Sequence, residues 1–169
     1  MTIATLEQKF VHDLADIYDA EHRFLEAQQT MHEHATAPEL KAMIKDHIAQ
    51  THQQIGNIEQ IYQQLGNAPQ RVKCDAATGL VIEGQKGLEE SKMNPAVRDC
   101  VIGSAIAKVE HYEVASYRGL VTSAESMGQN EIATLLRQNL QQEEQTAQLV
   151  EQSTPLLIER AMAAQQRAL

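Results

Sequence analysis

Four prolines divide this 169-residue chain into long segments that contain none. A helix interior tolerates proline poorly, so Pro38, Pro69, Pro95 and Pro155 are each expected at a helix end or in a loop. Ala, Gln, Glu and Leu dominate the segments between them, aromatic residues make up only 4% of the chain, and Trp is absent. Because these residue types favour helices and strand-forming types are scarce, the sequence predicts an all-α protein.

Apolar residues recur every three or four positions in each long segment, which is typical of amphipathic helices. Thr36 and Glu39 form a capping-box pattern, Asn94 is a second candidate N-cap, and Gly66 and Gly128 suit helix C-termini. The predicted helices cover about residues 5–34, 38–65, 95–127, 130–152 and 155–167. Residues 66–94 form a crossover that contains a short helical piece.

The lengths of the connections predict how these helices are arranged. The first two long helices are joined by only a few residues, and so are the next two, so each pair is expected to form an antiparallel hairpin. An up-down-up-down bundle would need a short middle connection, whereas residues 66–94 are a long one. We therefore expect residues 1–169 to form one domain, a ferritin-like antiparallel four-helix bundle with a long middle crossover and a fifth C-terminal helix.

Charge and composition exclude several classes of function. The chain has 14 Lys and Arg against 23 Asp and Glu and no basic tail, so it would repel nucleic acids and acidic membrane surfaces. No run approaches the roughly eighteen apolar residues of a membrane span, and the first ten residues lack the pattern of a signal peptide. Cys74 and Cys100 have no CxxC spacing. We expect a cytoplasmic protein that binds neither nucleic acid nor membrane.

Polar side chains interrupt the apolar face of each predicted bundle helix near its middle. A hairpin turn near residues 36–37 places Glu21 level with the stretch from His47 to Gln54. A turn near residues 128–129 places Glu113 opposite residues near 144. Because the midpoints of antiparallel helices share one layer, side chains from all four helices are expected to meet there, among them Glu21, Glu110, Glu113 and Glu143.

Ionised carboxylates in a buried layer repel one another, and each costs several kcal/mol of desolvation, so they must protonate, reach water or bind cations. Oxygen ligands with an imidazole or amide suit iron(II), manganese(II) or magnesium, and two divalent ions would balance four glutamates. Tyr18 and Tyr117 lie one turn from Glu21 and Glu113, where their phenols are expected to orient the ligands. His47 is either a ligand or a hydrogen-bonded core histidine.

The segment VEHYEVASYRGL, residues 109–120, resembles the YciE/YciF family of bacterial ferritin-like stress proteins. Further segments agree: LADIYDAEHRF, the stretch from His47 to Gln54 followed by IGNIEQIYQQLG, RVKCDAATGLVIEG and LLRQNLQQEE. The resemblance implies a ferritin-like bundle that pairs into a homodimer, a candidate di-iron or di-manganese centre, and a role in general stress responses. The biochemical function of the family is undefined.

The resemblance implies that four glutamates of the family pattern are present in this chain, namely Glu21, Glu110, Glu113 and Glu143. Other positions depart from the family pattern, because Gln50 and Gln142 replace common glutamates and Ala147 takes a place where many members have Asp. An amide oxygen binds a hard cation more weakly than a carboxylate. Gln50 and Gln54 are therefore expected as weak ligands, and a site with one ion is an alternative to a site with two.

Two functions are compatible with these features. The first is a metal-binding stress protein whose two iron or manganese ions react with peroxide or oxygen, as a non-haem oxidoreductase or peroxide-detoxifying enzyme. Magnesium or another divalent ion could substitute. In it Glu113 or Glu110 bridges the ions, while Glu21 and Glu143 are terminal ligands. The second is a non-catalytic structural or partner-binding helical dimer with a degenerate metal site. The fifth helix and the outer faces of the first two are the candidate dimer surfaces.

Overall fold

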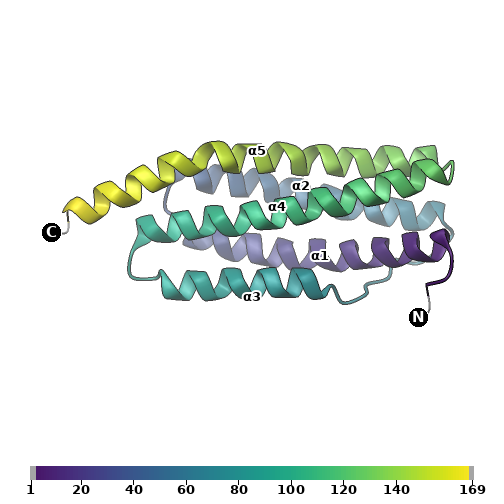
Figure 1. Ribbon diagram of the computed structural model, residues 1–169, viewed down its shortest axis with the longest axis horizontal. Coiled ribbons are helices and arrows are strands. Elements are labelled where there is room, and N and C mark those ends of the chain that lie inside the picture. The colour runs from purple at the N-terminus through teal and green to yellow at the C-terminus, as the bar shows by residue number, and fades with distance from the viewer. Residues whose placement is uncertain (1–2, 168–169) are drawn as a thin grey trace.

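Four long helices and one shorter helix make up the protein in the computed structural model, which describes residues 3–167. They are α1 (Leu6–His34), α2 (Pro38–Gln64), α3 (Asp75–Glu90), α4 (Pro95–Ser126) and α5 (Asn130–Arg167). Helices α1, α2, α4 and α5 run lengthwise beside one another, and α3 lies along α1 and α4 (Figure 1). The predicted all-α, ferritin-like four-helix bundle with a long crossover is confirmed.

The helix ends follow the sequence at most positions. Thr5 caps α1 in a capping box with Gln8, and the Asn94 side chain accepts a hydrogen bond of 3.2 Å from the Val97 N–H. Gly66 and Gly128 follow α2 and α4 with φ angles of +70° and +73°, a conformation that favours glycine. Gly128 lies in the hairpin turn between α4 and α5, and so helps to fix the heights at which residues of these two helices meet, whereas Gly66 begins the crossover.

The capping box expected at Thr36 does not form. Helix α2 has Ala37 as its N-cap residue, without a side-chain cap. Instead, the buried Asp99 carboxylate of α4 accepts hydrogen bonds from Thr36 N–H (2.8 Å), Thr36 Oγ1 (2.6 Å) and Ala37 N–H (2.8 Å). A carboxylate that is distant in sequence thus caps the start of α2, which a local motif cannot reveal.

The predicted break between residues 152 and 155 is wrong, because α5 continues through Pro155 to Arg167. Pro155 and Glu151 are both exposed, so water can bond the Glu151 carbonyl that loses its helix partner. Leu157 is buried beside Val150 and Ile102, and this packing favours continuation of the helix. The last turns of α5, yellow in Figure 1, run at an angle to the rest.

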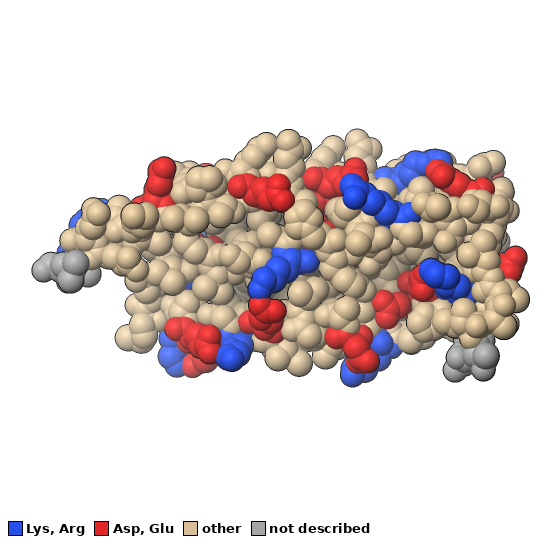
Figure 2. Space-filling model, in the orientation of Figure 1, with Lys and Arg blue, Asp and Glu red and all other residues tan. Residues whose placement is uncertain are grey.

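The crossover contains more structure than the sequence predicts. Helix α3 spans 16 residues, and Cys74 is buried at its N-terminus, where Sγ accepts from the Ala77 N–H. Among residues 3–167, no helix combines the length and apolar character that a membrane span requires. On the face drawn in Figure 2, basic side chains lie among acidic ones, in agreement with the absence of an extended basic surface there.

The apolar core consists of two clusters with a polar layer between them. One cluster includes Phe10, Ile58 and Leu120, and the other includes Leu40 and Ile102. Along each bundle helix the buried side chains change from apolar to polar and back again. The polar layer is formed by Glu21, Gln28, His47, Thr51, Gln54, Glu110, Glu113, Asn139, Glu143 and Thr146, all of them at most 4% exposed.

Candidate metal centre

The polar layer contains four glutamates, one or two from each of three helices. Glu21 comes from α1, Glu110 and Glu113 from α4, and Glu143 from α5, and each is at most 1% exposed. The spacing of three between Glu110 and Glu113 places both on the inner face of α4. Helix α2 contributes His47, which is 3% exposed. These side chains lie together in one buried layer, as the sequence predicts.

Four of these residues surround one small space. His47, Glu110, Glu113 and Glu143 each offer one ligand atom, and these atoms lie within 4.8 Å of one another. His47 Nε2 is 2.9 Å from Glu110 Oε1, yet neither atom makes a hydrogen bond of acceptable geometry. The imidazole and carboxylates therefore converge on the space between them, as ligands around a cation do.

When all four glutamates are ionised, five carboxylate oxygens of this centre have no hydrogen-bond donor among the described residues. They are Glu21 Oε2, Glu110 Oε1 and Oε2, Glu113 Oε2 and Glu143 Oε2. Proteins rarely leave buried polar atoms unpaired, since each costs about 1–3 kcal/mol, and more when the group is charged. Divalent cations are the natural partners of such oxygens, so the donor set fits iron(II), manganese(II) or magnesium.

Burial and mutual repulsion govern the protonation of the metal-free centre. Burial, with a smaller contribution from Glu143, raises the pKa of Glu21 to about 8 despite the hydrogen bond from Tyr117. Burial likewise raises the pKa of Glu110 to about 7. The pKa values of Glu113 and Glu143 are raised well above the ordinary value by burial and by neighbouring carboxylates. Without cations, the glutamates hold protons near neutral pH.

A chain of hydrogen bonds holds one side of the centre. The Tyr117 hydroxyl donates to Glu21 Oε1, and Gln54 Nε2 donates to Glu143 Oε1. Asn139 Nδ2 donates to the Tyr117 hydroxyl oxygen (3.0 Å) and to the backbone carbonyl of Gln54 (3.3 Å). Asn139 is a residue of the site that the sequence did not predict, although its polar side chain at an inward position of α5 was a usable signal. These contacts orient the carboxylates of Glu21 and Glu143.

The remaining predicted residues lie at different distances from the centre. Gln50 Oε1 lies 3.3 Å from His47 Nδ1 and accepts from Thr146 Oγ1, so this half-buried amide contacts the back of the imidazole. Gln54 contacts the centre directly through Glu143. Tyr18 does not join it, because its hydroxyl donates to Glu59 at 2.8 Å. The prediction is therefore supported for Tyr117 and not for Tyr18.

The chain resembles known proteins over most of its length. A family model described as a domain of unknown function, DUF892, matches residues 5–163. The chain belongs to this family. Protein YciF of Escherichia coli (strain K12) is 36% identical to it over 147 residues, which cover 86% of this chain and 88% of that protein. The resemblance carried by residues 109–120 is thereby confirmed.

Solved structures of related proteins share the fold. The E. coli stress protein YciF matches with a TM-score of 0.84 at 34% identity, over 94% of this chain and 98% of that one. YcfI of Rhodopseudomonas palustris is described as a candidate structural protein. It matches with a TM-score of 0.86 at 34% identity, over 88% of this chain and 94% of that one. A protein of Xanthomonas campestris pv. campestris, 23% identical, matches with a TM-score of 0.77 over 96% and 99%, and supports the fold alone.

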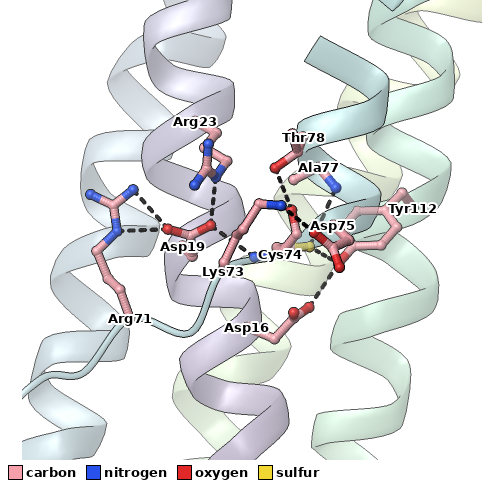
Figure 3. Close-up of polar contacts among 10 residues, drawn as sticks. All are labelled: Asp16, Asp19, Arg23, Arg71, Lys73, Cys74, Asp75, Ala77, Thr78 and Tyr112. Atoms are coloured by element: carbon pink, nitrogen blue, oxygen red, sulfur yellow. Dashed lines mark hydrogen bonds and ion pairs between the residues drawn. The ribbon is translucent and has the colours of Figure 1, made fainter. Parts of the chain in front are cut away.

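A second buried polar cluster joins the crossover to α1 and α4. Asp19 accepts hydrogen bonds from Arg23 Nε (2.5 Å), Arg71 Nε (2.9 Å) and Cys74 N–H (2.9 Å). Cys74 Sγ lies 3.0 Å from the hydroxyl of Tyr112, which donates to Asp16 at 3.1 Å. Figure 3 shows the two arginines reaching Asp19 from different sides. The protein itself supplies the partners of this cluster, unlike those of the glutamate centre.

Proposed function

We propose that this protein is a metal-binding stress protein whose di-iron or di-manganese carboxylate centre reacts with hydrogen peroxide or oxygen. The observation that carries the proposal is the set of five unpartnered carboxylate oxygens beside His47 Nε2. Two divalent cations would neutralise the four glutamates. The name of the E. coli relative, a stress protein, supports the physiological part of the proposal.

Each residue of the centre has a role in this proposal. His47, Glu110, Glu113 and Glu143 would hold one ion, since their ligand atoms are already grouped. Glu21 would hold the second, with Glu113 or Glu110 bridging the two and Glu21 and Glu143 as terminal ligands. Gln50 and Gln54 supply amide oxygens as weak ligands only if their side chains turn. Gln54 now donates to Glu143, which keeps that carboxylate in place.

Two redox-active ions, when bound, would supply two electrons, one from each ion, which with two protons reduce one hydrogen peroxide to two water molecules. The protein's part is to hold the carboxylates ionised and oriented and to keep bulk water out. Tyr117 and Gln54 fix the carboxylates of Glu21 and Glu143, and the apolar clusters on both sides of the layer exclude solvent. The chemistry is that of a non-haem oxidoreductase.

Metal analysis of protein purified without chelator or histidine tag tests this proposal. We expect about two iron or manganese ions per chain, as the four carboxylates require. Glu113→Gln should lose most of this metal while it stays folded. Glu144→Gln is the matched control, because Glu144 is the exposed neighbour of Glu143 and pairs with Arg118. Failure of both metals to bind under anaerobic conditions would overturn the proposal, and metal without peroxide consumption would overturn its catalytic part.

A structural or partner-binding role is the second candidate. Gln50 and Gln142 favour it, because they stand where the family resemblance leads one to expect carboxylates, and the R. palustris relative is described as structural. Thermal unfolding separates the two candidates. A metal at a hundred times its dissociation constant stabilises the folded state by about 3 kcal/mol, and raises the midpoint of a domain this size by about 5–10 °C. An unchanged midpoint would favour the structural role.

The proposal includes a homodimer in the cytoplasm. Exposed apolar side chains on the outer part of α5, namely Leu149, Leu156, Ile158 and Met162, support this helix as the dimer surface. Sedimentation of the wild-type protein should give twice the mass of the chain, and Leu156→Glu should shift the equilibrium towards monomer. A wild-type monomer at all concentrations would exclude the dimer without affecting the metal centre.

A further inference from the structure

A small apolar cavity reaches the glutamate centre from the side of α1 and α4. Its walls are Phe24, Ala27, Gln28 and Met31 of α1 and Ile106, Val109 and Glu110 of α4, and its water-accessible volume is about 10 Å³. This volume is close to the minimum that accommodates one water molecule. A molecule of two heavy atoms would need only a small movement of a flexible wall residue, and Met31 is such a residue.

Two polar residues, Gln28 and Glu110, belong to the walls of this otherwise apolar space. Gln28 Nε2 has no hydrogen-bond partner among the described residues, although its carbonyl oxygen accepts from Thr51 Oγ1 at 3.1 Å. Both carboxylate oxygens of Glu110 are also unpartnered. Gln28 is 4% exposed and Glu110 is fully buried, so bulk water cannot satisfy either. Gln28 Nε2 is thus an unused hydrogen-bond donor on a residue that lines the cavity next to the centre.

The cavity and a crevice at the surface share one wall residue, Ala27. This half-buried residue also lines an outer crevice of about 380 Å³ between α1 and α3, together with residues such as Thr30, Val81 and Gln85. Helix α3 lies along α1, as Figure 1 shows, and its Gly84 adjoins the methyl group of Met31. Ala27 therefore borders both spaces, and Met31 lines the inner one next to α3.

We infer that this cavity is the entry and binding pocket for hydrogen peroxide, with Gln28 Nε2 as the group that donates a hydrogen bond to it. The inference rests on the proposed function and adds the route and the recognising residue. Hydrogen peroxide has two heavy atoms, accepts and donates hydrogen bonds and carries no charge. The free amide donor gives it a binding contact that dioxygen, a poor acceptor, would use less well.

The apolar walls of this cavity disfavour the binding of charged ligands. A hydrated divalent cation would have to lose its water among Phe24, Met31, Ile106 and Val109, which offer no replacement ligands. An anion would meet the carboxylates of the centre and a chain with a net charge of −9. An uncharged oxidant is the class of ligand that avoids both costs.

Met31 provides a test of entry that needs no metal. Hydrogen peroxide oxidises a thioether by transferring one oxygen atom to sulfur, with cleavage of its O–O bond and release of water. Met31 is only 5% exposed, whereas Met93 is 88% and Met162 is 56% exposed. In metal-free folded protein we expect peroxide to oxidise Met31 nearly as fast as these exposed methionines, as measured by peptide mass spectrometry.

Variants of residues next to the cavity complete this test. Ala27→Leu should fill the path and slow Met31 oxidation about tenfold, because oxidation must then wait for local opening of the fold. Gly84→Ala should act in the same direction, since its methyl group would lie 3.0 Å from the methyl carbon of Met31. Ala42→Leu on the exposed side of α2 is the control and should change nothing. Met31 that stays reduced in wild-type protein would overturn the inference, as would equal rates in the blocked variants.

The role of Gln28 is tested in metal-loaded protein. Gln28→Leu keeps the side-chain size but removes the donor, so the peroxide concentration at half-maximal rate should rise severalfold at equal metal content. An unchanged concentration dependence would remove Gln28 from the inference. If peroxide reaches Met31 while the loaded protein consumes none, the pocket stands as an entry path and the proposed catalytic function fails. The two failures are thereby distinguishable.

Discussion

Asp19 and Glu21 lie two residues apart on α1, and both are buried, with exposed fractions of 3% and 0%. Burial alone would raise the pKa of Asp19, but hydrogen bonds from Arg23, the Cys74 N–H and Arg71 outweigh it and lower that pKa below the ordinary value. Within residues 3–167, Glu21 accepts a hydrogen bond only from the Tyr117 hydroxyl, and burial, together with the neighbouring Glu143, raises the pKa of Glu21 to about 8. One helix thus carries a carboxylate that the protein neutralises and another that it does not.

This difference separates two kinds of buried polar cluster. The Asp19 cluster has cations and N–H donors of its own, so it is complete as structure and ties the crossover to α1 (Figure 3). The glutamate centre gathers four carboxylates with one imidazole and no Lys or Arg partner among the described residues. A buried carboxylate therefore indicates a ligand site only when the fold leaves its charge uncompensated.

The largest expected effect is an opposite pH dependence of the two clusters in metal-free protein. The glutamates have folded pKa values above the ordinary 4.5, so their stabilisation is complete below pH 4.5 and is lost as the pH rises towards about 7 for Glu110 and about 8 for Glu21. Each should cost roughly 1 kcal/mol of unfolding free energy per pH unit over its range. Asp19 has a lowered pKa, so its contribution is present above pH 3.8 and is lost as the pH falls.

Urea unfolding in chelator at several pH values measures this effect. Stability should decline from about pH 5 to pH 8, and saturating metal should abolish the decline, because cations hold the carboxylates ionised. The affinity for metal should rise over the same range. A metal-free stability that is constant between pH 5 and 8 would mean that the glutamates are not held in a dry centre.

The sequence predicted the glutamate layer because it depends on features that are local and regular. Short hairpins fix the heights of the helix midpoints, and a glutamate at an inward position of an amphipathic helix is an anomaly that the pattern itself reveals. His47 and Gln54 were found on the same grounds. These arguments require only the period of the helix and two turns with glycine or proline.

The features that the sequence did not predict depend on partners that are distant in the chain. The Asp99 cap of α2 needs a contact across 63 positions, and Asp19 meets Arg71 across 52. Tyr18 and Tyr117 each lie one turn from a glutamate, but Tyr18 finds Glu59 on α2 instead. The passage of α5 through Pro155 depends on the burial of Leu157, which outweighs the cost of one lost hydrogen bond.

The next effect compares the loss of one carboxylate from each cluster. Asp19→Ala should lower the unfolding free energy by about 2 kcal/mol, because it leaves the buried Cys74 N–H without an acceptor and removes the ion pairs of two arginines that still reach water. Glu113→Gln in metal-free protein should change it by less than about 1 kcal/mol, because burial and the neighbouring carboxylates raise the pKa of Glu113 and favour the neutral form, which Gln resembles. Equal losses in the two variants, measured by urea unfolding in chelator, would contradict the distinction between the clusters.

The smallest effect concerns the two tyrosines. Tyr117→Phe removes the donor to Glu21 and should weaken metal binding about tenfold, as the loss of a group that orients a ligand does. Tyr18→Phe is the matched control, since its hydroxyl contacts Glu59 outside the centre, and it should leave metal affinity unchanged. Competition with a chelating dye measures both affinities. If both variants weakened binding equally, the hydroxyl of Tyr117 would have no specific role, and the orientation of Glu21 would depend on helix packing alone.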